Sequence, residues 1–164
     1  MRTYLRYALF ALVAGLVVVQ FFPADLPPQE PRPTTDLLGT QEVPEPIVSI
    51  LKTSCYDCHS VETRYPWYSK VAPVSWLVAK DVREGREEMN LSEWTDLAKR
   101  KKIKNLENIK DEVTEGHMPM PIYLVIHWDA RLTDEQRKQI ADWADSYQDQ
   151  ILNTPDPEEE EEEE

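Results

Sequence analysis

The sequence of 164 residues is short of cysteine, histidine and basic residues, and each shortage excludes a class of protein. Two cysteines cannot form the disulfide framework of a small secreted scaffold. Together with three histidines, they are too few for an array of zinc fingers. Eighteen lysines and arginines against 31 acidic residues give a formal net charge of −13, which argues against a nucleic-acid partner. No segment alternates between apolar and polar residues for long enough to predict a β-strand.

Apolar residues are numerous enough for a folded core, because they make up 41% of the chain and include five tryptophans. The acidic residues are concentrated outside that core. Residues 23–46 carry five acids and one base, and residues 155–164 carry eight acids, whereas residues 47–154 carry 15 basic and 18 acidic residues. We therefore expect a nearly neutral domain at 47–154, followed by a disordered acidic tail at 155–164.

Residues 1–22 have the pattern of a membrane-targeting segment. Arg2 and Arg6 precede an unbroken apolar run, and the stretch 4–22 would form about 28 Å of helix, close to the thickness of a bilayer core. The only candidate cleavage site places the bulky ring of Phe22 where a signal peptide has a small residue. We therefore expect an uncleaved single-pass anchor, with the arginines on the cytoplasmic side of the membrane and the domain outside.

Residues 23–46 hold seven of the 13 prolines, which predicts an extended and semi-rigid linker. Such a linker would reach up to roughly 70 Å and hold the domain away from the membrane without burying anything itself.

Apolar residues at helical spacing in 47–154 predict an all-α domain of about four or five helices. Helices are expected from Ile47, over 74–89, from Asn90 through a basic run to Gly116, and after Thr133. The last two of these begin with patterns that resemble capping boxes, and Gly116 is a suitable C-terminal stop.

The most informative motif is Cys55-Tyr-Asp-Cys58-His59. Placed at random, the two cysteines and three histidines of this chain would produce it in roughly one arrangement in 4,500, and it is the motif of c-type haem attachment. In that interpretation the two thiols bond to the vinyl groups of haem, and the imidazole of His59 is the proximal iron ligand. A thioredoxin-like dithiol requires a βαβ unit, and a structural zinc site requires a fourth ligand such as His117 or His127.

A second iron ligand is expected from the segment Met118-Pro-Met120-Pro. A methionine at the start of a loop stiffened by prolines has little freedom to swing away from iron, and we favour Met118. Met120, His117 and His127 are the alternatives, although a hydrogen-bonded core histidine is the better interpretation of His127.

An aromatic cluster follows the motif and is expected to line the same pocket. Trp67 and Tyr68 would cover the porphyrin, and Arg64 would offset the charge of a propionate. Ordinary packing in the core explains these aromatic residues equally well.

The ordered set of motifs resembles the bacterial haem-binding domain family, which consists of small, membrane-tethered monohaem c-type cytochromes. The resemblance covers about residues 46–150 and is carried by the Cys55–His59 motif, residues 65–86, Asn90-Leu-Ser-Glu-Trp, Gly116-His-Met-Pro and residues 123–132. It implies a cytochrome c-like helical domain on the periplasmic side of the bacterial inner membrane. It also implies one haem c per chain, with His59 as the proximal ligand and Met118 as the distal ligand.

These residues predict an electron carrier rather than an enzyme, because both axial positions of the iron would be filled by the protein. The expected partners are the membrane and one or more redox proteins, with no small-molecule substrate identified. A haem peroxidase or gas sensor with an open or labile distal position is the alternative.

Overall fold

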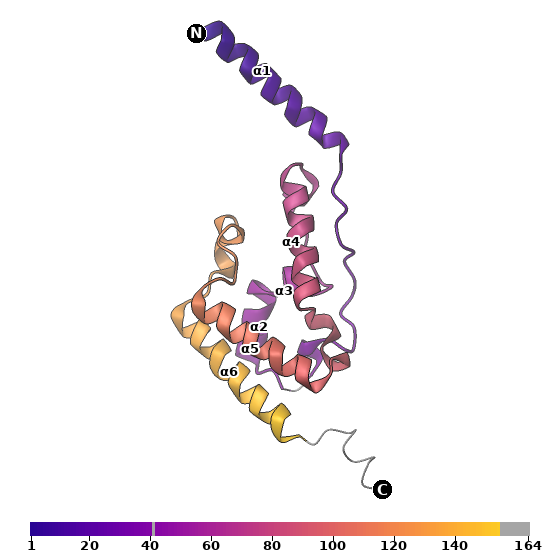
Figure 1. Ribbon diagram of the computed structural model, residues 1–164, viewed down its shortest axis with the longest axis vertical. Helices are drawn as coiled ribbons and strands as arrows, with labels where there is room; N and C mark the ends of the chain where they lie inside the picture. The colour runs from indigo at the N-terminus through magenta and orange to yellow at the C-terminus, as the bar shows by residue number, and fades with distance from the viewer. Residues whose placement is uncertain (41, 155–164) are drawn as a thin grey trace.

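A computed structural model describes residues 1–40 and 42–154, which form six α-helices joined by short 3-10 turns (Figure 1). The α-helices are α1 (Arg2–Val18), α2 (Glu45–Ser54), α3 (Tyr56–His59), α4 (Val74–Glu88), α5 (Lys99–Glu115) and α6 (Asp134–Asn153). The 3-10 turns are η1 (Val19–Phe21), η2 (Leu37–Gly39), η3 (Trp67–Lys70), η4 (Leu91–Asp96), η5 (Tyr123–Val125) and η6 (Trp128–Ala130). Residues 1–40 and 42–154 include no β-strand, and the prediction of an all-α chain with an apolar N-terminal helix is confirmed.

Several helix ends form where the sequence predicts them. The Thr133 hydroxyl accepts a hydrogen bond from the Gln136 amide at 3.2 Å, and the Gln136 side chain accepts from the Thr133 amide at 2.9 Å, so α6 begins with a capping box. Gly116 ends α5 with a φ of 81°, a left-handed conformation that favours glycine.

The predicted single helix from Asn90 to Gly116 is wrong, because the chain breaks at Leu97 and Ala98. The Asn90 side chain caps η4 instead of a long α-helix, accepting from the Ser92 amide at 3.1 Å. The break lets Trp94 enter the core, where its indole N–H donates to the Tyr147 hydroxyl at 2.9 Å.

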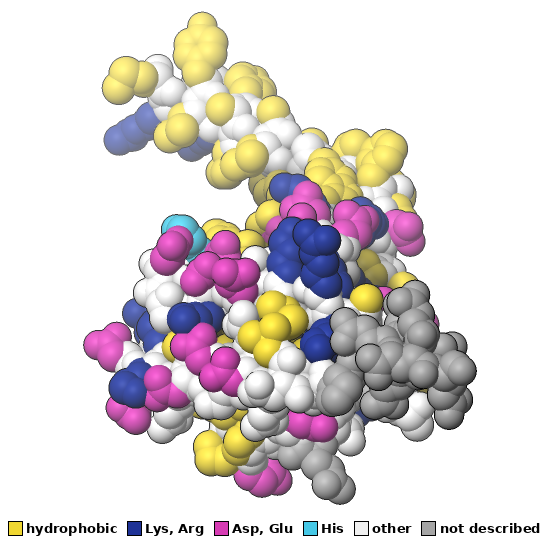
Figure 2. Space-filling view, turned by 60° about the horizontal axis from the view of Figure 1, so that its bottom comes forward, with side chains coloured by type: hydrophobic (Ala, Val, Ile, Leu, Met, Phe, Trp, Pro, Cys, Tyr) yellow, Lys and Arg dark blue, Asp and Glu magenta, His cyan; other side chains and the backbone are white. Residues whose placement is uncertain are grey.

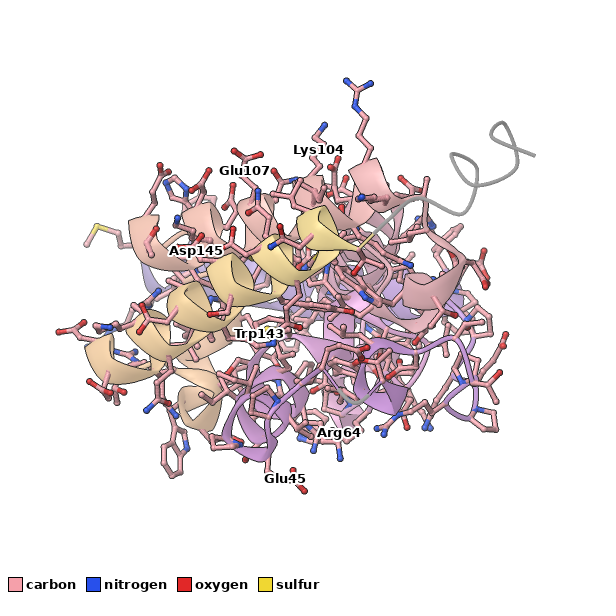
Figure 3. The ribbon with its side chains drawn as sticks, turned by 90° about the horizontal axis from the view of Figure 1, so that it is seen from below. Glu45, Arg64, Lys104, Glu107, Trp143 and Asp145 are labelled. Carbon is pink, nitrogen blue, oxygen red and sulfur yellow. The ribbon has the colours of Figure 1, made fainter. Side chains whose placement is uncertain are left out.

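The most extensive helix–helix packing in the core is between α5 and α6, which lie against each other as an antiparallel pair (Figure 1). Figure 3 shows Trp143 and Asp145 on opposite sides of α6. The Trp143 side points into the domain, and Asp145 forms an ion pair with Lys110 of α5 at 2.7 Å. The buried apolar residues that these two helices share are Leu106, Ile109, Val113, Ile140, Trp143, Ala144 and Tyr147.

The proline-rich segment 23–46 packs against the folded domain. The expectation that it buries none of its own residues is therefore wrong. Asp36 and Leu37 have no exposed surface, and Leu37 and Val43 belong to the hydrophobic core. Earlier in the segment, carbonyl oxygens accept hydrogen bonds from the folded domain, such as that of Pro27 from the Tyr65 hydroxyl at 2.7 Å. Residues 23–33 form no helix, and this part of the chain runs along the domain beside α4 (Figure 1). The predicted acidic tail, 155–164, lies outside the described residues.

Candidate cofactor site

The cysteine–histidine motif forms a single helical turn, α3, with Cys55 at its N-cap position. Its closing hydrogen bond runs from the His59 amide to the Cys55 carbonyl at 3.0 Å. Residues three and four apart lie on the same face of a helix, so Cys55, Cys58 and His59 share one side of the turn. All three line a single cavity of about 230 Å³.

On the opposite side of α3, Tyr56 packs into the hydrophobic core and is only 3% exposed. Its hydroxyl donates to the buried carboxylate of Asp36 at 2.9 Å. Asp36 also accepts from the Leu38 amide at 2.9 Å and from the Ser92 hydroxyl at 3.0 Å. A buried carboxylate with several donors fixes its neighbours firmly. Asp36 therefore holds the motif in place, although sequence reasoning had assigned it to a linker.

The cavity lies between α3, α4 and the chain that follows α5 (Figure 1). Met118, Pro119 and Met120 line it from this last segment, so the structure brings the predicted methionine to the same cavity as the motif. The complete lining is Ser54, Cys55, Asp57, Cys58, His59, Asp81, Glu84, Gly85, Glu88, Met118, Pro119, Met120 and Tyr123.

His59 is held in the orientation of a metal ligand. Its Nδ1 atom lies 3.1 Å from the Met89 carbonyl oxygen, which can only accept, so the proton of the neutral ring is on Nδ1. Burial lowers the pKa of His59 below its usual value, which favours the neutral ring. The lone pair of Nε2 is then available for coordination, in the arrangement typical of histidines bound to metals.

Burial also affects the thiols. It raises the pKa of Cys55 to about 12, with Cys58 as a second cause, and the pKa of Cys58 to about 11, helped by Asp57 and Asp81. Both are therefore protonated at neutral pH, whereas a redox-active dithiol has a lowered thiol pKa. Within 1–40 and 42–154, no group of three or more His, Cys, Asp or Glu side chains is arranged to hold a metal ion.

Two backbone hydrogen bonds fix Met118 at the end of α5. Its amide donates to the Glu112 carbonyl at 3.0 Å, and its carbonyl accepts from the Arg137 guanidinium at 3.2 Å. His117, by contrast, is 64% exposed and lies 3.3 Å from the Glu115 carboxylate, and it does not line the cavity. Among these neighbouring candidates, the cavity contains the methionines and not His117.

The loop that carries the methionines is joined to the motif through Asp57. Its carboxylate accepts from the Tyr123 hydroxyl at 3.1 Å, and from the amide and the guanidinium of Arg64 at 3.1 and 3.2 Å. Burial and the charge of Asp57 raise the pKa of Tyr123 above its usual value, so this hydroxyl remains a donor. His127 stacks on Tyr123 with ring centres 4.1 Å apart.

The predicted aromatic wall is only partly present. A second cavity of about 50 Å³ shares five lining residues with the first, and Arg64 and Tyr68 line this second cavity. The Tyr68 hydroxyl is hydrogen-bonded to His127 Nε2, so His127 is a half-buried, hydrogen-bonded histidine. Trp67 is 78% exposed and lines neither cavity. The guanidinium of Arg64 is already paired with Asp57, and it projects at the edge of the molecule in Figure 3.

Sequence reasoning missed the contribution of α4, whose Asp81, Glu84, Gly85 and Glu88 line the cavity. Burial raises the pKa of Asp81 above its usual value. No sequence signal marks these carboxylates, because charged residues on a helix are usually solvated. Gly85 does carry a signal, since glycine is unfavourable inside a helix unless another part of the chain approaches closely.

We expect Gly85→Ala to push α4 away from the motif. A Cβ atom at this position would lie 2.9 Å from the Cys58 carbonyl oxygen and 3.2 Å from the Cys58 Cβ. Relieving this overlap requires the backbone of α3 or α4 to shift, which costs more free energy than moving a flexible side chain. The predicted result is a loss of about 1–3 kcal/mol in unfolding free energy and a lower haem content per chain, measured by denaturation and absorbance. Gly39→Ala is the matched control, because its Cβ meets nothing closer than 3.7 Å. Equal behaviour of the two variants would contradict the close packing of α4 on α3.

The fold and the site together define a small helical protein with a cavity lined by two thiols, an imidazole and two thioethers. The model of the haem-binding domain family matches residues 14–146, so the chain belongs to that family and binds haem. The match confirms the predicted resemblance but reaches further towards the N-terminus than expected, because it includes the whole proline-rich segment and the end of α1. No curated protein and no solved structure matches the chain.

Proposed function

We propose that this protein is a membrane-tethered c-type cytochrome that transfers single electrons on the extracytoplasmic side of the membrane. The observation that carries the proposal is the single cavity in which Cys55, Cys58, His59 and Met118 meet. Haem supplies an iron that alternates between the ferrous and ferric states and so carries one electron at a time.

The residues present fit such a group. Cys55 and Cys58 would add as thiols to two vinyl groups, each forming a carbon–sulfur bond while its hydrogen passes to the adjacent vinyl carbon, so the addition would be redox-neutral. His59 would hold the iron through Nε2, because its Nδ1–H is held by the Met89 carbonyl. Met118, which lines the same cavity, would supply a thioether ligand, and such a ligand favours the ferrous form.

Filling both axial positions with side chains supports an electron carrier over an enzyme. Small molecules then have no open position, and a change of oxidation state requires little rearrangement. The partner would be another redox protein, and one haem per chain follows from the single motif.

The tether is supported by α1 and η1, since residues Arg2–Phe21 are long and apolar enough to cross a membrane. A signal sequence would have the same composition. However, the end of this segment is bonded to the domain: the Gln20 side chain donates to the Ala72 carbonyl at 2.9 Å, and the Trp76 indole donates to the Phe22 carbonyl at 2.9 Å. These contacts give residues 20–22 a structural role that cleavage would remove, which supports an uncleaved anchor.

Optical spectra of the protein extracted from membranes test this function. With both axial positions filled, we expect a low-spin spectrum in both oxidation states and no rapid change when carbon monoxide is added to the reduced protein. Rapid binding of carbon monoxide at neutral pH would contradict the electron carrier. It would favour a peroxidase or gas sensor with an open distal position.

A further inference from the structure

Two exposed apolar clusters lie at one end of the domain. The first surrounds the start of α4 and consists of Trp67, Val71, Val74, Trp76 and Leu77, each 40–78% exposed. The second lies on the segment that follows the methionines and consists of Ile122, Val125, Ile126 and Trp128, each 58–76% exposed. Single exposed apolar side chains are ordinary, but groups that include three tryptophans mark an interaction surface.

Both clusters lie in segments without a carboxylate, although the chain has 31 acidic residues. Residues 65–79 contain one charged side chain, Lys70, and residues 117–128 contain no Asp, Glu, Lys or Arg. Neither segment would therefore be repelled by anionic lipid headgroups.

The polarity of α4 changes along its axis. Its first six residues, 74–79, are uncharged, whereas seven of the following nine are charged. An amphipathic helix on a protein surface changes polarity around its circumference. A change from one end to the other indicates instead that the two ends of α4 lie in different surroundings.

The first cluster lies where α1 joins the domain. The Gln20 side chain makes two hydrogen bonds to the Ala72 backbone, at 2.9 and 3.1 Å, and Trp76 donates to the Phe22 carbonyl. Figure 1 shows the segment that carries the second cluster rising on the same side of the domain, towards α1. Figure 2, viewed with the opposite end of the domain brought forward, shows a surface rich in acidic and basic side chains.

We propose that the two clusters are a lipid-docking surface that inserts into the headgroup layer of the membrane spanned by α1. This inference rests on the proposed tether. Lipid is the occupant because the first cluster is continuous with the end of the membrane-spanning segment, and because tryptophan rings favour the membrane interface. The domain then has a fixed orientation, with the segment that carries Met118 and Tyr123 held at the membrane.

Photo-crosslinking of the full chain in its native membrane tests the proposal. Benzoylphenylalanine replaces one residue at a time: Leu12 within α1, Val125 in the second cluster, and Ser146 on the exposed side of α6. Val125 is 73% exposed, so the replacement leaves the core intact. After irradiation, phospholipid attached to the protein is detected by mass spectrometry.

Lipid adducts at Leu12 and Val125, with Ser146 at least tenfold lower, are the expected result. Adducts at Leu12 without adducts at Val125 would overturn the docking surface and leave the tether intact. Adducts to a protein at Val125, or equal lipid labelling at Val125 and Ser146, would also overturn it. Absence of lipid at Leu12 would overturn the tether itself, and the docking surface with it.

Discussion

Replacing both Cys55 and Cys58 with serine is expected to abolish the covalent attachment of haem completely. A serine hydroxyl is of similar size but lacks the nucleophilic sulfur that bonds to a vinyl carbon. After expression in a host that matures c-type cytochromes, the unmodified chain keeps its haem colour on a denaturing gel, and the double variant loses it. Each single variant retains one thioether and is expected to show weaker staining.

Ser54→Ala is a suitable control for this experiment, because Ser54 lines the same cavity and carries no sulfur. Its hydroxyl donates to the Ala130 carbonyl at 3.0 Å, so the variant loses one hydrogen bond, worth about 1 kcal/mol, and keeps its covalent haem. If acid–acetone extracted all haem from the unmodified protein, the family assignment would stand, since it requires haem binding alone. Covalent attachment would then be wrong.

The helices were largely predictable from the sequence, and α6 most clearly, because it combines an apolar face at helical spacing with a capping box at its start. The failures have a common physical cause. The break at Leu97 depends on Trp94 reaching Tyr147, a contact made 53 residues along the chain. Likewise, the prolines predict an extended segment, which fits residues 23–33, where the chain forms no helix. They do not reveal the 3-10 turn η2 or the burial of Asp36 and Leu37.

The same distinction between local and distant contacts applies to the site. Spacings of three and four residues suffice to place Cys55, Cys58 and His59 on one face of a helix, because helix geometry is local. The hydrogen bond of His59 to the Met89 carbonyl spans 30 residues, and that of Asp57 to Tyr123 spans 66. Such contacts arise only from the packed fold. They give the motif its orientation, whereas the sequence reveals its chemistry.

Met118→Ala is expected to remove the distal iron ligand. The two backbone hydrogen bonds of Met118 hold it at the cavity, and alanine there leaves no donor atom. We predict that the ferric protein loses the long-wavelength absorption of methionine-ligated haem and that the reduced protein binds carbon monoxide rapidly. The midpoint potential should fall by on the order of 0.1 V, a fraction of the range of about 0.8 V that axial ligands span.

Met120→Ala is the matched control, since both methionines line the cavity and the substitution removes the same atoms. Both variants lose comparable packing, so a purely structural effect would lower the unfolding free energy of both and leave the spectrum of each intact. Ligation predicts a different result, in which only Met118→Ala changes the spectrum and the potential. The reverse pattern would assign the iron to Met120. If neither variant changed the spectrum, methionine ligation would be wrong. His117 lies beside the Glu115 carboxylate and does not line the cavity, so the distal ligand would then have to come from elsewhere in the chain.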